Sequence, residues 1–134
     1  MTPHMMTVEH DPPKSYGDCY RTCIACVLDV PPETVPHPGR EGIRRWDELM
    51  GEVNEWLAQR GIYSVLLKDT PANLAKNCDY FGYHLIAGRS PRGGHYCVGL
   101  GGIVVHDPSP LGGELLPDED GTFTIELLVM GAKR

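Results

Sequence analysis

Three features common in other protein classes are missing from this chain of 134 residues. No apolar run approaches the roughly 18 residues that a membrane-spanning helix needs, which argues against an integral membrane protein. Positive charge is not in excess: 12 lysines and arginines face 18 acidic residues, and a net charge of −6 disfavours nucleic-acid binding. Residues 1–10 hold neither an apolar stretch nor a basic leader, so the sequence predicts no signal peptide.

The chain also lacks the even number of cysteines that is typical of a protein held by disulfide bonds. Five are present, and an odd number fits free thiols in a reducing compartment better than a framework of disulfides. These observations predict a cytoplasmic protein without a nucleic-acid or membrane partner. A hydrophobic content of 41% and a charged content of 22% are ordinary for a globular protein, and the length suits a single domain over residues 1–134.

Hydrophobic periodicity divides the chain into a helical first half and a strand-rich second half. Helices are expected from Asp18 or Cys19 to Leu28, with Asp18 as the N-cap, and at 46–57 and 71–77. Strands are expected at 62–67, 80–87, 95–99, 103–106 and 122–129, with an extended arm at 1–17, a turn at 90–94 and a loop at 108–121. This order predicts an α+β fold, in which N-terminal helices pack on one side of an antiparallel sheet.

The tripeptide Gly17-Asp18-Cys19 stands where the first helix begins. The partial positive charge of a helix N-terminus favours thiolate over thiol, and the thiolate is the nucleophilic form of cysteine. A histidine held by a carboxylate is the usual partner of such a nucleophile, and His95 and Asp107 lie on predicted strands. The sequence therefore predicts a triad in which Cys19 attacks, His95 is the base or the imidazolium of an ion pair, and Asp107 orients the imidazole.

Each member of this triad has a plain structural alternative. A lone cysteine is more often interior packing, and a strand histidine near a turn often has no chemical role. Asp107 precedes Pro108, a pair that frequently starts turns. His106 is the alternative base, although neighbours on a strand point to opposite faces and His106 should therefore point away from Asp107.

Whether His95 and Asp107 share a face depends on the turn between their strands, because directly opposed residues of an antiparallel pair lie on one face. With the two-residue loop Gly101-Gly102, His95 would face Pro108, and Asp107 would point to the other side. With a three-residue loop over 100–102, His95 would lie directly opposite Asp107, and the last glycine can supply left-handed geometry. The triad therefore predicts the three-residue loop.

The oxyanion hole is the least defined part of the predicted site. The backbone N–H of Cys19 supplies one donor, and a second usually comes from a side chain a few residues upstream. The one glutamine of the chain is Gln59, far downstream, so Ser15 and Tyr16, with Lys14 beside them, are the candidates.

The cysteines also allow two metal interpretations. Cys19, Cys23 and Cys26 form a C-x3-C-x2-C pattern, which occurs in radical enzymes that bind an iron–sulfur cluster. The same spacing places Cys23 and Cys26 on a buried helix face, and the chain is short for a barrel of that kind. Zinc held by cysteines with His95 or His106 lacks the usual ligand spacing. We therefore expect no metal and no cofactor.

Two parts of the chain resemble a widespread group of small, mostly uncharacterised phage-encoded proteins. They are GDCYRTC at 17–23, followed by Val35-Pro36-His37, and SPRG at 90–93 with His95 and VHDP at 105–108. These proteins are similar in layout to papain-like peptidases of the bacteriocin-processing type, which carry a cysteine at a helix start, a histidine opening a strand and an aspartate before proline.

The resemblance covers residues 16–113 and implies a papain-like fold. It matches Cys19 to the nucleophile, His95 to the base and Asp107 to the orienting acid, while the glutamine that such peptidases carry before the cysteine is missing. It implies a cysteine-dependent peptidase, isopeptidase or amidase with an acyl-thioester intermediate. It further implies a protein or peptide-like substrate, including a host protein. The location that it implies is the cytoplasm of a phage-infected bacterium. The rival is a non-catalytic accessory protein that binds a host protein on the same fold.

Overall fold

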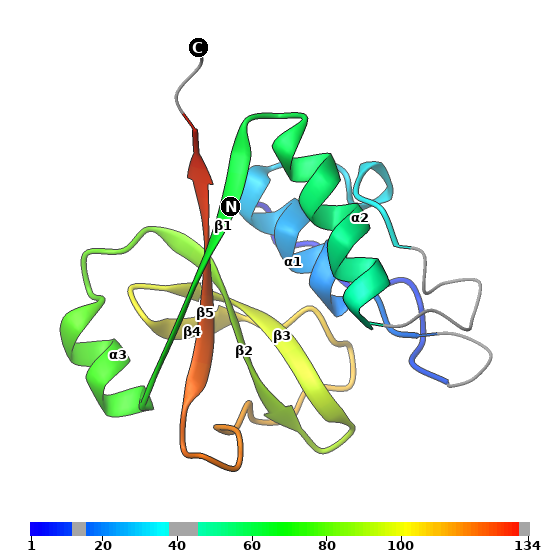
Figure 1. Ribbon diagram of the computed structural model, residues 1–134. Helices are drawn as coiled ribbons and strands as arrows, with labels where there is room; N and C mark the ends of the chain where they lie inside the picture. The colour runs from blue at the N-terminus through cyan, green and yellow to red at the C-terminus, as the bar shows by residue number, and fades with distance from the viewer. Residues whose placement is uncertain (12–15, 38–45, 132–134) are drawn as a thin grey trace.

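The computed structural model describes residues 1–11, 16–37 and 46–131 (Figure 1). Helices and strands follow one another in the predicted order, with one helix between the first two strands. The elements are α1 (Cys19–Leu28), η1 (Pro32–Thr34), α2 (Trp46–Ala58), β1 (Ile62–Asp69), α3 (Pro71–Asn77), β2 (Tyr83–Ser90), β3 (Gly93–Leu100), β4 (Ile103–His106) and β5 (Phe123–Met130). In the described residues, no helix combines the length and the apolar character needed to cross a membrane.

The five strands form one antiparallel sheet in the order β1-β5-β2-β3-β4. The C-terminal strand β5 lies between β1 and β2 and pairs with both, so the two halves of the chain are joined through its backbone hydrogen bonds. The predicted α+β class and the antiparallel sheet are confirmed.

The sheet separates two buried clusters, since successive residues of a strand point to opposite faces. Leu85 and Val98 join the first cluster with α1 and α2, whereas Ile86 and Cys97 join the second with Leu74 of α3. Figure 1 shows α1 and α2 together on one side and α3 apart from them. The expectation that all helices pack on one side is therefore wrong, because the short helix α3 covers the apolar residues of the other face.

Two element ends differ from the predicted ones for local reasons. β2 begins at Tyr83, not at residue 80, because Phe81 is held in a turn by hydrogen bonds to Cys78 and Gly101. The turn expected at 90–94 is shorter, since β2 runs to Ser90 and β3 starts at Gly93. α2 has buried Val53 and Leu57, while the side chains of Trp46 and Leu49, expected on the same stripe, lie outside the described part.

The loop between β3 and β4 has two residues, not the predicted three. Leu100 pairs directly with Ile103, and the intervening Gly101-Gly102 has φ values of 61° and 83°. A side chain on Gly102 would approach the carbonyl oxygen of Leu74 to 2.5 Å, and the Gly102 N–H donates to Nε2 of the buried His84 at 3.0 Å. The tight turn is therefore fixed by contacts from α3 and β2, which a local pattern does not contain.

A β-bulge next to this loop changes which face of the sheet the residues after it occupy, and the predicted triad requires this change. Gly99 pairs with Val104, but Val98 pairs with His106, so Val105 is an extra residue without an opposite partner. One extra residue moves everything after it to the other face.

As a result, Asp107 joins the face of β3 that carries His95. The predicted juxtaposition of the two side chains is present, although the surplus residue lies in the strand and not in the loop.

Residues 1–11 form neither a helix nor a regular strand and are held against the body by specific contacts. Asp18 is fully buried, and its carboxylate accepts hydrogen bonds from the N–H groups of Thr7 and Val8 and from Arg21 Nε. Met6 N–H donates to the carbonyl of Pro108. Asp18 occupies the N-cap position, but its side chain makes no cap hydrogen bond, because it binds this arm instead.

Candidate active site

Cys19 is the first residue of α1, and a buried polar contact fixes this helix on the sheet. The Tyr20 hydroxyl donates to both carboxylate oxygens of Glu126 on β5, at 2.9 and 3.1 Å. The Tyr20 ring also packs on Tyr96 of β3, with centroids 4.7 Å apart. These contacts join residues about a hundred positions apart and hold the N-terminal end of α1 against the strand that carries His95.

His95 and Asp107 form a close pair. His95 Nε2 lies 2.7 Å from Asp107 Oδ1, and the imidazole is buried. The same carboxylate oxygen accepts the N–H of Ser109 at 2.8 Å, and the thiol of Cys97 donates to Asp107. With Asp107 held at three points, the Nε2–H of His95 points to the carboxylate, and Nδ1 is left as the basic nitrogen.

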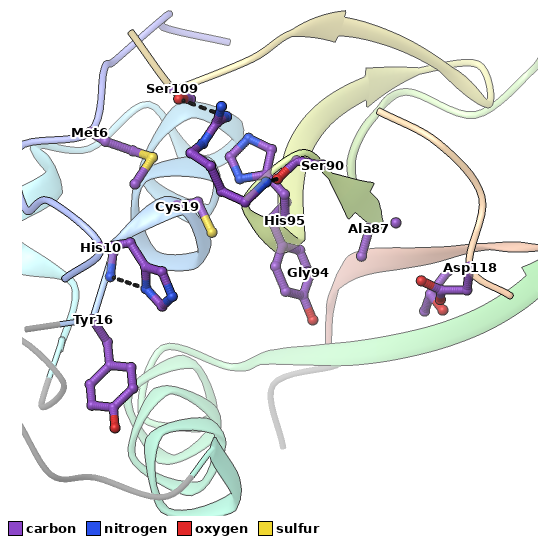
Figure 2. A pocket seen from close by; sticks show the side chains of 15 residues that line it. Met6, His10, Tyr16, Cys19, Ala87, Ser90, Gly94, His95, Ser109 and Asp118 are labelled. Carbon is purple, nitrogen blue, oxygen red and sulfur yellow. Dashed lines mark hydrogen bonds between the residues drawn. The ribbon is translucent and has the colours of Figure 1, made fainter. Parts of the chain in front are cut away.

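One cavity of about 490 Å³ brings the predicted nucleophile and base together. Cys19 and His95 both line it, and Figure 2 draws both side chains among the residues around it. Among the described residues, the other four cysteines are buried outside this lining. The structure thus places Cys19, His95 and Asp107 in the spatial order of thiol, imidazole and carboxylate.

The thiol of Cys19 is less acidic than a helix N-terminus predicts. Burial raises its pKa from an ordinary 9.0 to about 11, and the neighbouring Asp18 carboxylate adds to the rise. Hydrogen bonds from the backbone N–H groups of Tyr96 and Tyr20 oppose this change without cancelling it. The helix N-terminus alone favours the thiolate, whereas desolvation of a negative sulfur favours the protonated thiol.

The two predicted oxyanion donors have different outcomes. Ser15 lies outside the described residues, as does Lys14. Tyr16 lines the cavity, and its carbonyl accepts a hydrogen bond from His37 Nε2 at 2.8 Å.

A residue that sequence reasoning missed, His10, also lines the cavity (Figure 2). Its Nδ1 accepts the N–H of Gly17 at 3.1 Å, which leaves the proton on Nε2. A side chain at residue 17 would lie 3.1 Å from the His10 Cβ, so the glycine allows this close approach. The one sequence feature that could have indicated this contact is the glycine two residues before Cys19. No local pattern, however, relates that glycine to residue 10.

The alternative residues are placed elsewhere. His106 Nε2 lies 2.7 Å from the carbonyl oxygen of His4 in the N-terminal arm, and His106 is not among the residues that line the cavity. Cys23 and Cys26 are fully buried in the first cluster, and the N–H of His4 donates to the Cys26 sulfur. The C-x3-C-x2-C spacing therefore reflects a helix whose Cys23 and Cys26 pack in the core, while Cys19 at its N-terminus lines the cavity.

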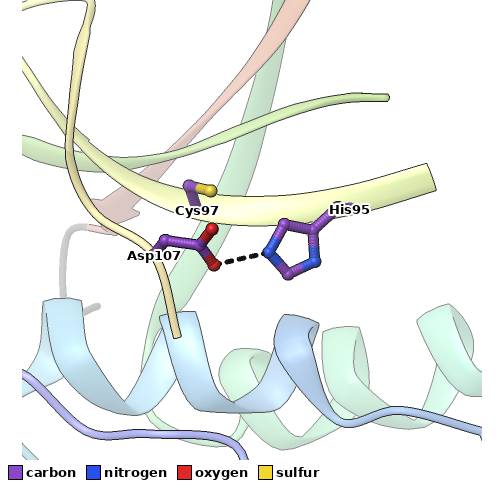
Figure 3. A group of neighbouring side chains, drawn as sticks. All are labelled: His95, Cys97 and Asp107. Carbon is purple, nitrogen blue, oxygen red and sulfur yellow. Dashed lines mark hydrogen bonds and ion pairs between the residues drawn. The ribbon is translucent and has the colours of Figure 1, made fainter. Parts of the chain in front are cut away.

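A different group has the arrangement of metal ligands. One ligand atom each from His95, Cys97 and Asp107 lies within 4.8 Å of the others (Figure 3). Nitrogen, sulfur and oxygen ligands of this kind suit zinc. Two protons now occupy this space, since the imidazole and the Cys97 thiol both donate to Asp107. A metal ion would have to displace both.

Comparison of the chain with family models, with curated proteins and with solved structures finds no match. The site is therefore judged from its own geometry.

Proposed function

We propose that the protein is a cysteine-dependent hydrolase that cleaves an amide, isopeptide or related acyl bond in a protein or peptide-like substrate. One observation carries the proposal. The imidazole of His95 is held by Asp107 through Nε2, and His95 lines the same cavity as Cys19. This is the arrangement in which a histidine takes a proton from a thiol.

The raised pKa of Cys19 selects between the two roles open to His95. A thiol with a pKa of about 11 is protonated at neutral pH, so His95 Nδ1 acts as a general base during the attack. The sulfur adds to the substrate carbonyl, the S–H proton passes to Nδ1, and this proton then goes to the leaving group as the acyl-thioester forms. His95 next activates a water molecule, which hydrolyses the thioester and releases Cys19.

Two donors are available for the oxyanion of this reaction. The first N–H groups of a helix have no acceptor within the helix, so the N–H of Cys19 can serve. The Nε2–H of His10 is the second, because Gly17 occupies its other nitrogen. In this proposal His10 takes the place of the glutamine that papain-like peptidases carry before the cysteine.

Alkylation of Cys19 tests the proposal. Iodoacetamide should modify Cys19 before the other four thiols, because Cys19 is half-buried in an open cavity and they are buried in the core. Replacing His95 by alanine should slow this reaction at pH 7 by about tenfold or more, since the general base is lost. Intact mass and peptide mapping measure the rate and the position, and Cys19→Ala is the control for a single adduct.

The pH profile separates general-base activation from simple ionisation. In the His95→Ala variant, the rate should keep rising with pH toward about 11, where the thiol itself ionises. In the wild type, the rate should already be substantial near neutral pH. Equal rates for the two proteins at every pH would rule out the hydrolase mechanism.

One observation favours the rival, a non-catalytic protein that binds a host protein. A thiol with its pKa raised to about 11 is poorly suited to spontaneous attack. Equal rates in the experiment above would support this rival. The resemblance to small phage proteins supports the further proposal that either activity takes place in the cytoplasm of an infected bacterium.

A further inference from the structure

Arg92 stands at the mouth of the cavity that holds Cys19 and His95. It belongs to the two-residue turn between β2 and β3, and its side chain is exposed. Among the described residues that line the cavity, it is the one lysine or arginine. A permanent positive charge thus belongs to the lining that also holds the predicted nucleophile.

The guanidinium is held in position through one of its nitrogens. Arg92 Nη2 donates to Ser109 Oγ at 3.2 Å and to the carbonyl of Gly112 at 3.1 Å; Figure 2 draws the first of these bonds. Ser109 in turn donates its N–H to Asp107. The orientation of Arg92 is therefore coupled to the His95–Asp107 pair through the loop after β4.

The rest of the guanidinium has no anionic partner. Neither hydrogen bond uses Nη1 or Nε, and no carboxylate in the described part of the chain forms an ion pair with Arg92. The acidic residue of the lining, Asp118, is drawn on the other side of His95 from Cys19 in Figure 2. A fixed guanidinium with free donors is a typical receptor for a carboxylate.

We propose that Arg92 binds a carboxylate of the substrate beside the acyl group that Cys19 attacks. This inference rests on the proposed hydrolase function and defines its substrate class, an acyl compound with an acidic group next to the scissile bond. The carboxylate comes either from an acidic side chain or from a free C-terminus. Both sources present the same two oxygens to the guanidinium.

Two alkylating reagents of nearly equal size test the charge preference. Iodoacetate carries a carboxylate where iodoacetamide carries an amide, and with either reagent the Cys19 sulfur bonds to the methylene carbon and iodide leaves. The measured quantity is the ratio of the iodoacetate rate to the iodoacetamide rate at Cys19. Arg92→Gln should lower this ratio by about fivefold, as expected for a partly exposed charge pair. Added salt should lower the wild-type ratio toward that of the variant.

Three variants make the result specific. Arg92→Lys keeps the positive charge but lacks the paired N–H donors of the guanidinium, and it should give an intermediate ratio. Arg89→Gln is the matched control, because Arg89 lies near the end of β2, three residues before Arg92, donates to the carbonyl of Pro117 and is not part of the lining. Its ratio should equal that of the wild type. Ser109→Ala removes one anchor of Arg92 and should lower the ratio, which provides a second test if Arg92→Gln does not fold.

Unchanged ratios in Arg92→Gln and Ser109→Ala, or an equal loss in Arg89→Gln, would overturn the proposal. The hydrolase proposal fails separately, since it depends on the effect of His95 with iodoacetamide alone. Three larger probes identify the source: N-iodoacetyl-glycine, the α-amide of N-iodoacetyl-glutamate, and neutral N-iodoacetyl-glycinamide. Faster labelling by the first indicates a C-terminal carboxylate, and by the second an acidic side chain. No advantage for either over the neutral probe counts against Arg92.

Discussion

At the scale of single residues, the chemistry depends on which nitrogen of each histidine is occupied. His95 uses Nε2 for Asp107 and keeps Nδ1 for the cavity, whereas His10 uses Nδ1 for Gly17 and keeps Nε2–H. The first ring is therefore prepared to accept a proton and the second to donate one. Two imidazoles that line one cavity thus have opposite proposed roles.

The role of His10 leads to a prediction about acylation. His10→Ala should slow acylation of Cys19 by p-nitrophenyl acetate by about 10²-fold, since one oxyanion donor is lost. Alkylation by iodoacetamide creates no oxyanion, and its rate should change much less. The nitrophenolate burst and the intact mass measure the two reactions.

Conservative variants define which donor acts. His10→Gln restores an N–H donor and should recover part of the acylation rate. Tyr16→Phe removes the hydroxyl that the sequence suggested, and it should have little effect. A large loss in Tyr16→Phe together with normal acylation in His10→Ala would assign the oxyanion to Tyr16.

The sequence identified some residues of this cavity and missed others for a clear reason. Cys19, His95 and Asp107 have strong local contexts, namely a helix start, a strand start and an Asp-Pro pair. His10 and Arg92 lie in an irregular arm and in a turn, where no periodic pattern exists to show where a side chain points. Their positions depend on tertiary hydrogen bonds.

At the scale of elements, the β-bulge at Val105 determines whether the triad exists. The turn Gly101-Gly102 alone would leave Asp107 on the wrong face, and the extra residue reverses this. Most helix and strand positions followed from periodicity, but the bulge did not. Whether the surplus residue lies in a loop or in a strand is decided by contacts of the glycine turn with α3 and His84.

Insertion of one alanine between His106 and Asp107 should therefore separate His95 from Asp107 while keeping the sheet. Val98 can still pair with His106, the inserted residue takes the place of Asp107, and the Asp107 side chain turns to the opposite face. We expect His95-dependent alkylation of Cys19 to fall to the level of Asp107→Ala. Val105→Ala keeps the bulge and should behave like the wild type.

The Nε2–H proton of His95, observed by NMR, reports the same contact directly. Its signal should shift in the insertion variant as it does in Asp107→Ala. An unchanged imidazole signal after the insertion would show that the register of β4 is not what aligns the pair.

At the scale of the whole molecule, the order of the strands could not be predicted. β5 lies between β1 and β2, and both strands with which it pairs are distant from it in the sequence. Periodicity gives the elements and their class, but it does not say which strands become neighbours. The split of the helices between two faces has the same origin, because the apolar partners of α3 come from strands as distant in sequence as β5.

The buried thiols of this molecule predict a loss of stability in alkali. Burial raises the pKa of Cys19 to about 11, that of Cys97 to about 12, and that of Cys23 well above its ordinary 9.0. The folded protein therefore keeps protons that the unfolded chain releases above pH 9. The stabilisation is complete below pH 9 and decreases as the pH rises toward 11 and 12.

The expected slope is about 1.4 kcal/mol per pH unit for each such thiol. Urea unfolding with a reductant at pH 8, 9 and 10 measures it. Cys97→Val removes one of the thiols, and its unfolding free energy should fall less steeply with pH by about that amount. Parallel profiles for the wild type and this variant would contradict the assigned burial effect.

The surplus residue in β4 has a consequence for comparing genes. Loss of the codon for Val105 would straighten β4 and still leave Asp107 on the face that carries His95. One added codon, without a second bulge, would keep every one of these amino acids and disconnect the acid from the imidazole. A related gene should therefore be judged by its spacing as well as by its residue types: three or four residues between the glycine pair and Asp107 are compatible with the pair, and five require a further bulge.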